Sequence, residues 1–197
     1  MLELMIVISI LLILAAITDV SLQPALRSEQ VTNSFNLTLS AMRRARDQAA
    51  SDMQTYVITF SPAVAGVNGG SFTVNETTPA GPQMFAGVLP PNVTYNLEPG
   101  IPNSPTVAPT TPDGFGAAAN AIDFDWGPNG TGGGNTIYFY PDGSARDANG
   151  NINNGVIYLG IPGQVQTAHA ITVWGFTGRI RGWQIYSVSG KWTWIQQ

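Results

Sequence analysis

The N-terminal run of aliphatic residues most limits what this chain can fold into. Residues 4–17 contain no charged side chain, and Ser9 is their only polar one. A helix that is apolar on every face has no side to present to water, so this run cannot lie alone on a soluble domain. One carboxylate, Glu3, stands at its edge. Because a charge in hydrocarbon costs about 2.5–3.5 kcal/mol on insertion scales, Glu3 is a candidate functional residue.

Three interpretations compete for this run. A removable secretory signal needs a positive N-terminal region and a small-residue cleavage site, yet no Lys or Arg precedes Arg27. About 14 apolar residues suit a buried core helix, whereas a full membrane span normally takes about 20. If Thr18 and Asp19 lie at a headgroup boundary, the run is a short, marginal span. We favour a dual-purpose helix, which waits in the membrane and later packs against copies of itself.

An amphipathic pattern follows the aliphatic run. Apolar side chains recur at steps of three or four residues: Val31, Phe35, Leu39, Met42, Ala45, Ala49 and Met53. That spacing predicts one apolar stripe on a helix, and the stripe needs a sheet to cover. The two halves together predict a helix of about 50 residues, roughly 75–80 Å long. Pro24 removes a backbone hydrogen bond, so we expect a kink or an unwound stretch at residues 19–24.

The remainder of the chain is rich in β-branched and aromatic runs separated by turn residues. These runs predict strands at 55–60, 71–74, 121–126, 136–140, 155–160, 168–175, 179–188 and 192–195, with 93–97 as a further candidate. Residues 76–118 hold most of the prolines and predict a long surface loop. The predicted class is α+β, a long N-terminal helix packed on a C-terminal antiparallel sheet. Its parts are a hydrophobic membrane or filament-core helix (1–24), an amphipathic half packing on the sheet (25–54) and a β-rich domain (55–197).

Composition narrows the class of protein. Charged residues make up 10% of the chain, against about 25% in typical soluble domains. The 22 glycines and 14 prolines favour a turn-rich extracellular β protein over a cytosolic enzyme. A net charge of −4 provides no overall basic field for nucleic acid. The absence of cysteine excludes disulfides, thiolate chemistry and cysteine-ligated metals.

The N-terminal sequence carries a family resemblance. It reads LELMIV over residues 2–7 and ILAAI over residues 13–17, which resembles the start of mature type IV pilins and type II secretion pseudopilins. Two residues precede Glu3 here, where the family usually has four. Residues 41–49, 139–143, 155–159 and 171–180 are similar to the pseudopilin H/FimT-like branch.

The resemblance implies a structural subunit of an extracellular, cell-surface filament, built as a helical homo-oligomer by packing of N-terminal helices. It implies a precursor held in the inner membrane, a prepilin peptidase and pilus assembly machinery as partners, and no enzymatic activity. Glu3 would recruit and neutralise the terminal amine of a neighbouring subunit. The side chains expected at subunit contacts are Glu3, Leu4, Ile6, Val7, Ile10, Leu11 and Leu14.

An alternative function rests on two arginines near the C-terminus. Arg179 and Arg181 stand at i and i+2 on a predicted strand and project from one face. Lys191 is expected on the neighbouring strand, and the aromatic residues nearby are Trp183, Tyr186, Trp192 and Trp194. Cations interleaved with aromatic rings bind single strands. In FimT-like minor pilins a Gly-Arg-x-Arg element is associated with DNA uptake, so a minor pilin that binds DNA or secreted cargo is the alternative. A structural or inter-subunit role for this region is the favoured interpretation.

Other polar residues offer weaker candidates. His169 is the single histidine, and nothing in the sequence singles out a nucleophile for a catalytic triad. Asp123 and Asp125 alternate on a predicted strand, which predicts a common solvated face. The stretch Gly132–134 lacks the Lys and Ser/Thr of a phosphate loop, so a flexible loop is expected.

A calcium site is a further alternative. Its candidate oxygen ligands are Asp142, Asp147, Asn149 and Asn151. Asp-Gly and Asn-Gly pairs are ordinary turn signals, however, so turns are the favoured interpretation. We therefore expect no catalytic residue, metal or cofactor.

Overall fold

The computed structural model describes the chain except for residues 1, 65–68, 103–112, 116–119 and 128–131. It gives the backbone but not the side chains of residues 2, 4, 10, 13–22 and 24. The described part is α+β, as predicted, with one α-helix and two five-stranded antiparallel sheets. The elements are α1 (Leu2–Asp52), β1 (Tyr56–Ser61), β2 (Ser71–Glu76), β3 (Gln83–Val88), β4 (Ile122–Trp126), β5 (Thr136–Phe139), β6 (Ala145–Arg146), β7 (Asn154–Leu159), the 3-10 turn η1 (Val165–Thr167), β8 (His169–Trp174), β9 (Arg179–Val188) and β10 (Lys191–Gln196).

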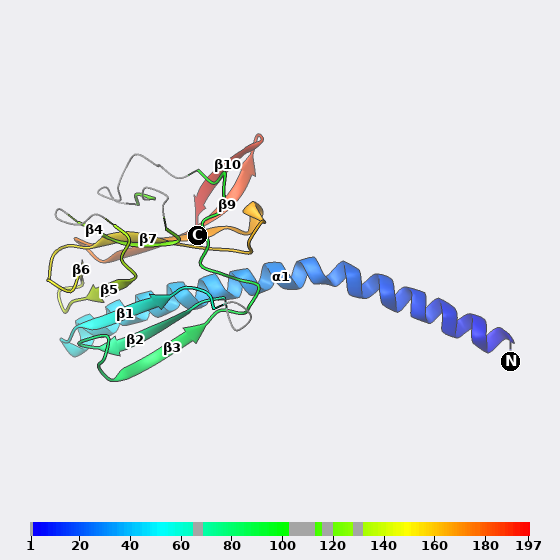
Figure 1. The fold of residues 1–197 in the computed structure, drawn as a ribbon, viewed down its shortest axis with the longest axis horizontal. Coiled ribbons are helices and arrows are strands. Elements are labelled where there is room, and N and C mark those ends of the chain that lie inside the picture. The colour runs from blue at the N-terminus through cyan, green and yellow to red at the C-terminus, as the bar shows by residue number, and fades with distance from the viewer. Residues whose placement is uncertain (1, 65–68, 103–112, 116–119, 128–131) are drawn as a thin grey trace.

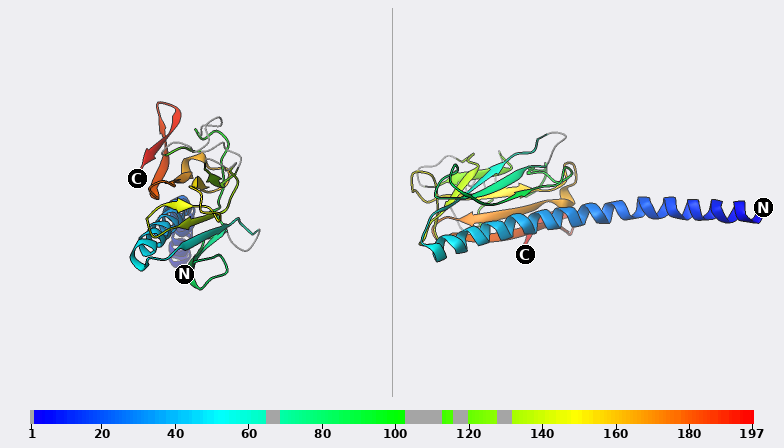
Figure 2. Two further views of the ribbon diagram at one scale, coloured as in Figure 1. Left: turned by 90° about the vertical axis from the view of Figure 1, so that its left-hand side faces the viewer. Right: turned by 90° about the horizontal axis from the view of Figure 1, so that it is seen from below.

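Helix α1 has two differently placed halves. The half nearer β1 runs along the β domain, and the other half extends beyond it to the N-terminus at the far end of the molecule (Figures 1 and 2). The backbone stays helical through residues 19–24, with a gentle curve, so the unwound stretch expected there is not observed. A kink at Pro24 within an assembly stays a prediction. Among the described residues, no helix is both long and apolar enough to cross a membrane.

The amphipathic stripe docks α1 on both sheets. Six of the seven predicted stripe residues are buried: Val31, Phe35, Leu39, Met42, Ala45 and Ala49. They face β1, β2 and β5 of one sheet and β9 of the other. The prediction was wrong for Met53, which is 73% exposed. The helix ends at Asp52, and Met53 adopts a left-handed φ of 54°, which turns the chain away before the stripe continues.

The first sheet has the strand order β3-β2-β1-β5-β6. Its buried aromatic residues include Phe60 and Phe72, which lie against each other beneath the helix. Strand β3 falls within residues 76–118, so the prediction of a Pro-rich loop is wrong there. It is an edge strand whose side chains are mostly exposed, so it lacks the apolar run that identifies a buried strand. Residues 93–97 form no strand and make one isolated bridge, Thr94 to Gly160.

The second sheet has the strand order β10-β9-β8-β7-β4. One sheet was expected from the sequence, and the observed pair of sheets corrects that expectation. Strand β7 is buried at every residue because both faces of this sheet are covered. Helix α1 and the main core cover one face. A smaller apolar cluster covers the other, which we call the outer face: Ile101, Val156, Tyr158, Ala168, Ala170 and Ile185.

The approach of α1 to β9 depends on a glycine. A Cβ atom added to Gly182 would lie 2.5 Å from the Phe35 ring and 3.1 Å from Leu39 Cδ2. Overpacking of this kind typically costs about 1–3 kcal/mol.

We therefore expect Gly182→Ala to lower the free energy of unfolding by that amount, measured by urea denaturation. Because Phe35→Leu removes the nearest ring, the double variant should lose less than the sum of the two single losses, and simple additivity would contradict this account.

Candidate functional site

The outer face of the second sheet carries a row of cationic and aromatic side chains. Side chains alternate along a strand, so Arg179, Arg181 and Trp183 of β9 share this face. Trp194 of β10 pairs with Ile185 in register and therefore joins them. We call these four residues the cation–aromatic row. The predicted common face of the two arginines is confirmed.

An aspartate that was not predicted from the sequence neutralises part of this row. Asp113 Oδ2 accepts hydrogen bonds from Arg179 Nη2 at 2.8 Å and from Arg181 Nη1 at 2.7 Å. Its Oδ1 accepts a longer bond of 3.4 Å from the hydroxyl of Thr172 on β8. The guanidinium groups are thus paired, although about a third of each arginine side chain stays exposed (38% and 33%). The buried Nε of Arg179 has no hydrogen-bond partner among the described residues.

The aromatic end of the row is also occupied. The ring of Phe115 lies 5.4 Å from that of Trp194 at an interplanar angle of 9°, and edge-on to Trp183 at 5.3 Å. The hydroxyl of Tyr158 donates to the backbone oxygen of Phe115. The indole Nε1 of Trp194 donates to the backbone oxygen of Pro102 at 2.7 Å. Two residues of one segment, Asp113 and Phe115, therefore cover both the cations and the indole faces.

Two of the other residues predicted near the arginines lie elsewhere, and a third, Trp192, shares their face of the sheet because it pairs with Ser187. Lys191 faces Val188 across the β9–β10 turn, seven residues along β9 from Arg181, or about 23 Å at 3.3 Å per residue. It is not part of the row. Tyr186 projects from the opposite face of β9, and its hydroxyl donates to Gln184. Trp192 packs partly buried against the outer-face cluster.

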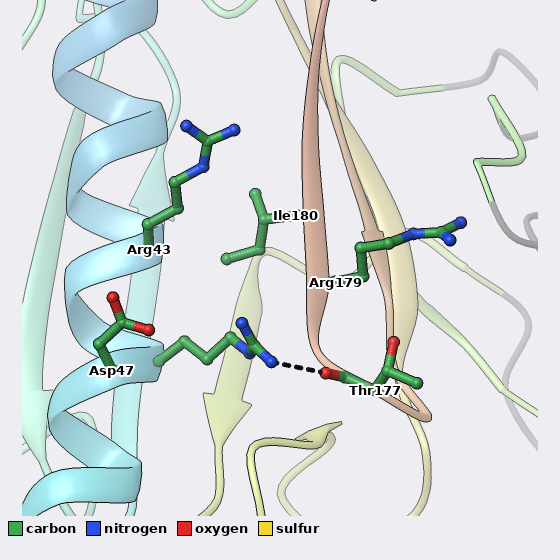
Figure 3. Close-up of a pocket in the computed structure, with 6 residues that line it drawn as sticks. Arg43, Asp47, Thr177, Arg179 and Ile180 are labelled. Carbon is green, nitrogen blue, oxygen red and sulfur yellow. Dashed lines mark hydrogen bonds between the residues drawn. The ribbon is translucent and has the colours of Figure 1, made fainter.

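A groove of about 520 Å³ separates the last turns of α1 from the start of β9 (Figure 3). Its lining residues are Arg43, Arg46, Asp47, Thr177, Arg179 and Ile180. Arg46 bridges the groove by donating to the backbone oxygens of Thr177 at 3.1 Å and Gly143 at 3.4 Å. Figure 3 shows Arg179 directed away from the helix, toward the outer face. The groove is therefore a structural junction between α1 and two turns, and Arg179 is the one residue that it shares with the cation–aromatic row.

His169 is buried in the core side of the second sheet. Its ring lies 4.7 Å from that of Phe35, and its Nδ1 is 2.8 Å from the carbonyl oxygen of Thr167. Because a carbonyl only accepts, Nδ1 carries the proton and donates. Burial lowers the pKa of His169, and the Thr167 bond opposes that shift only in part. The residue fits the structural interpretation better than a catalytic one, since no triad partner is in contact with it in the described part of the chain.

Of the four residues considered for calcium, Asp147, Asn149 and Asn151 meet in one turn, whereas Asp142 belongs to another. Asp142 pairs with Arg146 at 2.8 Å and accepts bonds from the hydroxyl and backbone N–H of Ser144, which hold its pKa below the usual range. Asp147 Oδ1 accepts from the backbone N–H groups of Asn149 and Asn151 at 2.8 Å each. Both carboxylates thus serve their own turns. The described ranges contain no cluster of three or more His, Cys, Asp or Glu residues placed to hold a metal ion.

The two aspartates of β4 differ from their predicted solvated face. Asp123 is 2% exposed and its Oδ1 accepts from the backbone N–H of Gly133 at 2.8 Å. A β-bulge follows Asp123, and Asp125 has a left-handed φ of 67°. Burial raises the pKa of Asp125, while a bond of 2.9 Å from Asn153 opposes that shift. The bulge breaks the simple alternation on which the prediction relied, and the aspartates instead anchor the glycine loop.

The projecting half of α1 (residues 2–30) carries the predicted assembly residues. Every side chain described in this half is exposed. The exposed apolar residues include Met5 (71%), Ile6 (50%), Val7 (55%), Leu11 (60%) and Leu12 (65%). Glu3 is exposed as well, whereas the side chains of Leu4, Ile10 and Leu14 lie outside the described residues. The described side chains of residues 5–12 thus form an exposed, largely aliphatic surface at the far end of this half, without cover from the described part of the chain.

Comparisons with known proteins add no family. No protein-family model, curated protein or solved structure matches this chain. Inferences about function therefore rest on the two surfaces described above, the projecting half of α1 and the cation–aromatic row.

Three residues with a clear structural role were not predicted from the sequence: Asp113 and Phe115, which cover the cation–aromatic row, and Arg46, which bridges the groove beside α1. Asp113 stands 66 residues before Arg179, in a segment that was predicted to be a Pro-rich loop. No periodicity links two positions so far apart in the sequence. The signal that was present is modest: an acid and an aromatic residue close together within a stretch otherwise rich in Pro, Gly and Ala.

Burial of His169 predicts a pH-dependent stability. The folded-state pKa lies below the unfolded value of 6.5, so the folded chain binds fewer protons than the unfolded chain between these two values. The stabilising contribution is complete above about pH 6.5 and is lost as the pH falls toward the folded-state pKa. We expect His169→Gln, which cannot gain this charge, to show a smaller loss of unfolding free energy between pH 7.5 and pH 5.5. An identical slope in urea titrations of both proteins would contradict the assignment.

Proposed function

We propose that this protein is a structural subunit of a type IV pilus-like extracellular filament. The observation that carries the proposal is the projecting half of α1, whose aliphatic side chains are exposed on every described face. Exposed apolar surfaces of this extent mark interaction sites. Over residues 4–17 the helix is narrow and its sequence is apolar on every face apart from Ser9, so copies of itself, bundled in parallel, would cover it most completely.

Burial of the aliphatic side chains supplies the driving free energy of assembly. Each fully buried Leu, Ile, Val or Met side chain contributes about 1.5–3 kcal/mol. Glu3 sets the axial position, because an unpaired carboxylate inside such a bundle costs several kcal/mol and requires a cationic partner. A neighbouring subunit's terminal amine is the expected partner. Before assembly the helix would be held in the inner membrane as a precursor and processed by a prepilin peptidase.

The division of α1 supports the same function. The half from Val31 to Asp52 is fixed to the β domain by its buried stripe. The projecting half therefore has a rigid base, and the β domains are placed on the outside of the bundle. In this arrangement the fold is a pilin fold, with the β domain as the solvent-facing surface of the filament.

Charged substitutions in the projecting half should abolish assembly. We expect Ile6→Lys and Leu11→Lys to prevent filament formation, since each places a cation in the bundled core, while the circular dichroism of the β domain stays unchanged. The measurement is the yield of sheared extracellular filaments, examined by electron microscopy and mass spectrometry. Val188→Lys is the matched control, because Val188 is 50% exposed on the β domain. Glu3→Ala should also block assembly, and wild-type filament yields from Glu3→Ala and Leu11→Lys would refute the proposal.

A second candidate function is binding of single-stranded nucleic acid. The observation that favours it is the placement of Arg179, Arg181, Trp183 and Trp194 on one face of the second sheet. Cations beside stacked aromatic rings are the usual elements of single-strand binding. The protein would then act as a minor subunit, present in small numbers within a filament.

This second function predicts a salt-dependent contribution from the arginine pair. Arg179→Ala/Arg181→Ala should weaken retention of single-stranded DNA, and the slope of log K against log salt should fall by about 0.7 for each phosphate that is no longer neutralised. Retention is measured at two salt concentrations. Lys191→Ala is the matched control, because Lys191 lies about 23 Å from Arg181 along β9. Equal retention and equal salt slopes for wild type and the double variant would remove the nucleic-acid function.

A further inference from the structure

The segment from Asp113 to Phe115 fills the cation–aromatic row with the two kinds of group that a nucleotide offers. A carboxylate oxygen occupies the guanidinium pair, and an aromatic ring occupies the indole faces. We propose that Asp113 and Phe115 act as an internal ligand that covers this site and limits its binding of single-stranded nucleic acid. The inference rests on the second function proposed above and names the regulation of that site.

The interactions of Asp113 resemble those of a bound phosphate oxygen. One oxygen, Oδ2, bridges both arginines at 2.8 and 2.7 Å, so a single negative charge serves two guanidinium groups. The row keeps one net positive charge as a result. The buried Nε of Arg179 still lacks an acceptor among the described residues. A phosphate group, with more acceptor oxygens than a carboxylate, satisfies this donor set more fully.

The interactions of Phe115 resemble those of a stacked base. Its ring is nearly parallel to Trp194, at 9°, and meets Trp183 edge-on. Stacking on an aromatic side chain does not depend on the identity of the base. The anion and the ring are carried by one short segment, as they are by one nucleotide. The occupant thus identifies the class of ligand as an anionic strand that bears flat rings.

The internal ligand can be displaced because its ion pairs are only partly buried. Both arginines are about one-third exposed, and partly exposed ion pairs contribute little net stability. A nucleic acid presents many phosphates and releases counterions when it binds. Its electrostatic contribution to binding therefore exceeds that of a single carboxylate. The covered site would therefore bind weakly, and removal of either covering side chain would strengthen binding.

Fluorescence anisotropy tests this inference. The protein in detergent is titrated against a labelled single-stranded DNA of about 20 nucleotides, which is longer than the site size of a single binding domain. We expect Asp113→Asn and Phe115→Ala each to lower the dissociation constant about tenfold, the scale of one stacking or charge interaction. Asp113→Asn should also steepen the salt dependence by about 0.7 for each additional phosphate neutralised. Asp142→Asn is the matched control, because it removes a carboxylate paired with a different arginine, Arg146. Addition of Arg179→Ala/Arg181→Ala to Asp113→Asn should reverse the tighter binding.

The outcomes separate the two proposals. If wild type binds and loses affinity with Arg179→Ala/Arg181→Ala, but Asp113→Asn and Phe115→Ala bind no more tightly, the internal ligand is refuted and the second function stands. If no variant binds DNA, both fail together. If the uncovered variants bind a peptide of residues 111–117 but not DNA, the site is a peptide site and the inference is overturned. Thermal unfolding of each variant shows whether it folds, and Phe115→Ala leaves every charged group in place should Asp113→Asn not fold.

Discussion

Burial of one stripe of α1 against both sheets is the interaction on which the rest of the structure depends. The two sheets share no hydrogen-bonded strand in the described part of the chain, and the helix is packed against strands of each. Small residues of α1, Ala45 and Ala49, are fully buried, and Gly182 of β9 lets the Phe35 ring approach. Without this packing the face of the first sheet beneath the helix would be exposed to water. The covered face of the second sheet would also be exposed to water, so helix and sheets are expected to form together.

One half of α1 is exposed to water and the other half packs against the β domain. From Val31 the apolar side chains of the stripe are covered by the chain's own sheets, whereas none of the side chains described before Val31 is buried. The two halves form one continuous helix, with no break between the exposed residues and the buried ones. The exposed half is thus an extension of a helix that its buried stripe fixes to the β domain, and not a tail joined by a linker. Such an extension suits a subunit whose neighbours are set by helix packing.

Sequence periodicity predicted those elements whose burial is one-sided and regular. The stripe from Val31 to Ala49 was identified because a helix with one covered face repeats every three to four residues. Edge strand β3 was missed because its side chains are mostly exposed and carry no such signal. The bulge after Asp123 broke the strand alternation that placed it on a solvated face. Asp113 was missed for another reason. Its role depends on the partner arginines, which are distant in the sequence, and only the folded chain brings them together.

The Asp113 pairing changes how the arginines of β9 are interpreted. A sequence motif of two arginines on one strand face indicates a positive surface, but the local charge depends on what the fold places opposite them. Here one carboxylate reduces that charge by half, and a ring from the same segment occupies the neighbouring indoles. A cover of this face must supply an anion, because an apolar segment would leave two partly buried guanidinium groups unpaired. It does not have to supply an aromatic ring parallel to Trp194 as well. The combination of an anion and a ring on one short segment is what a site for an anionic strand would select.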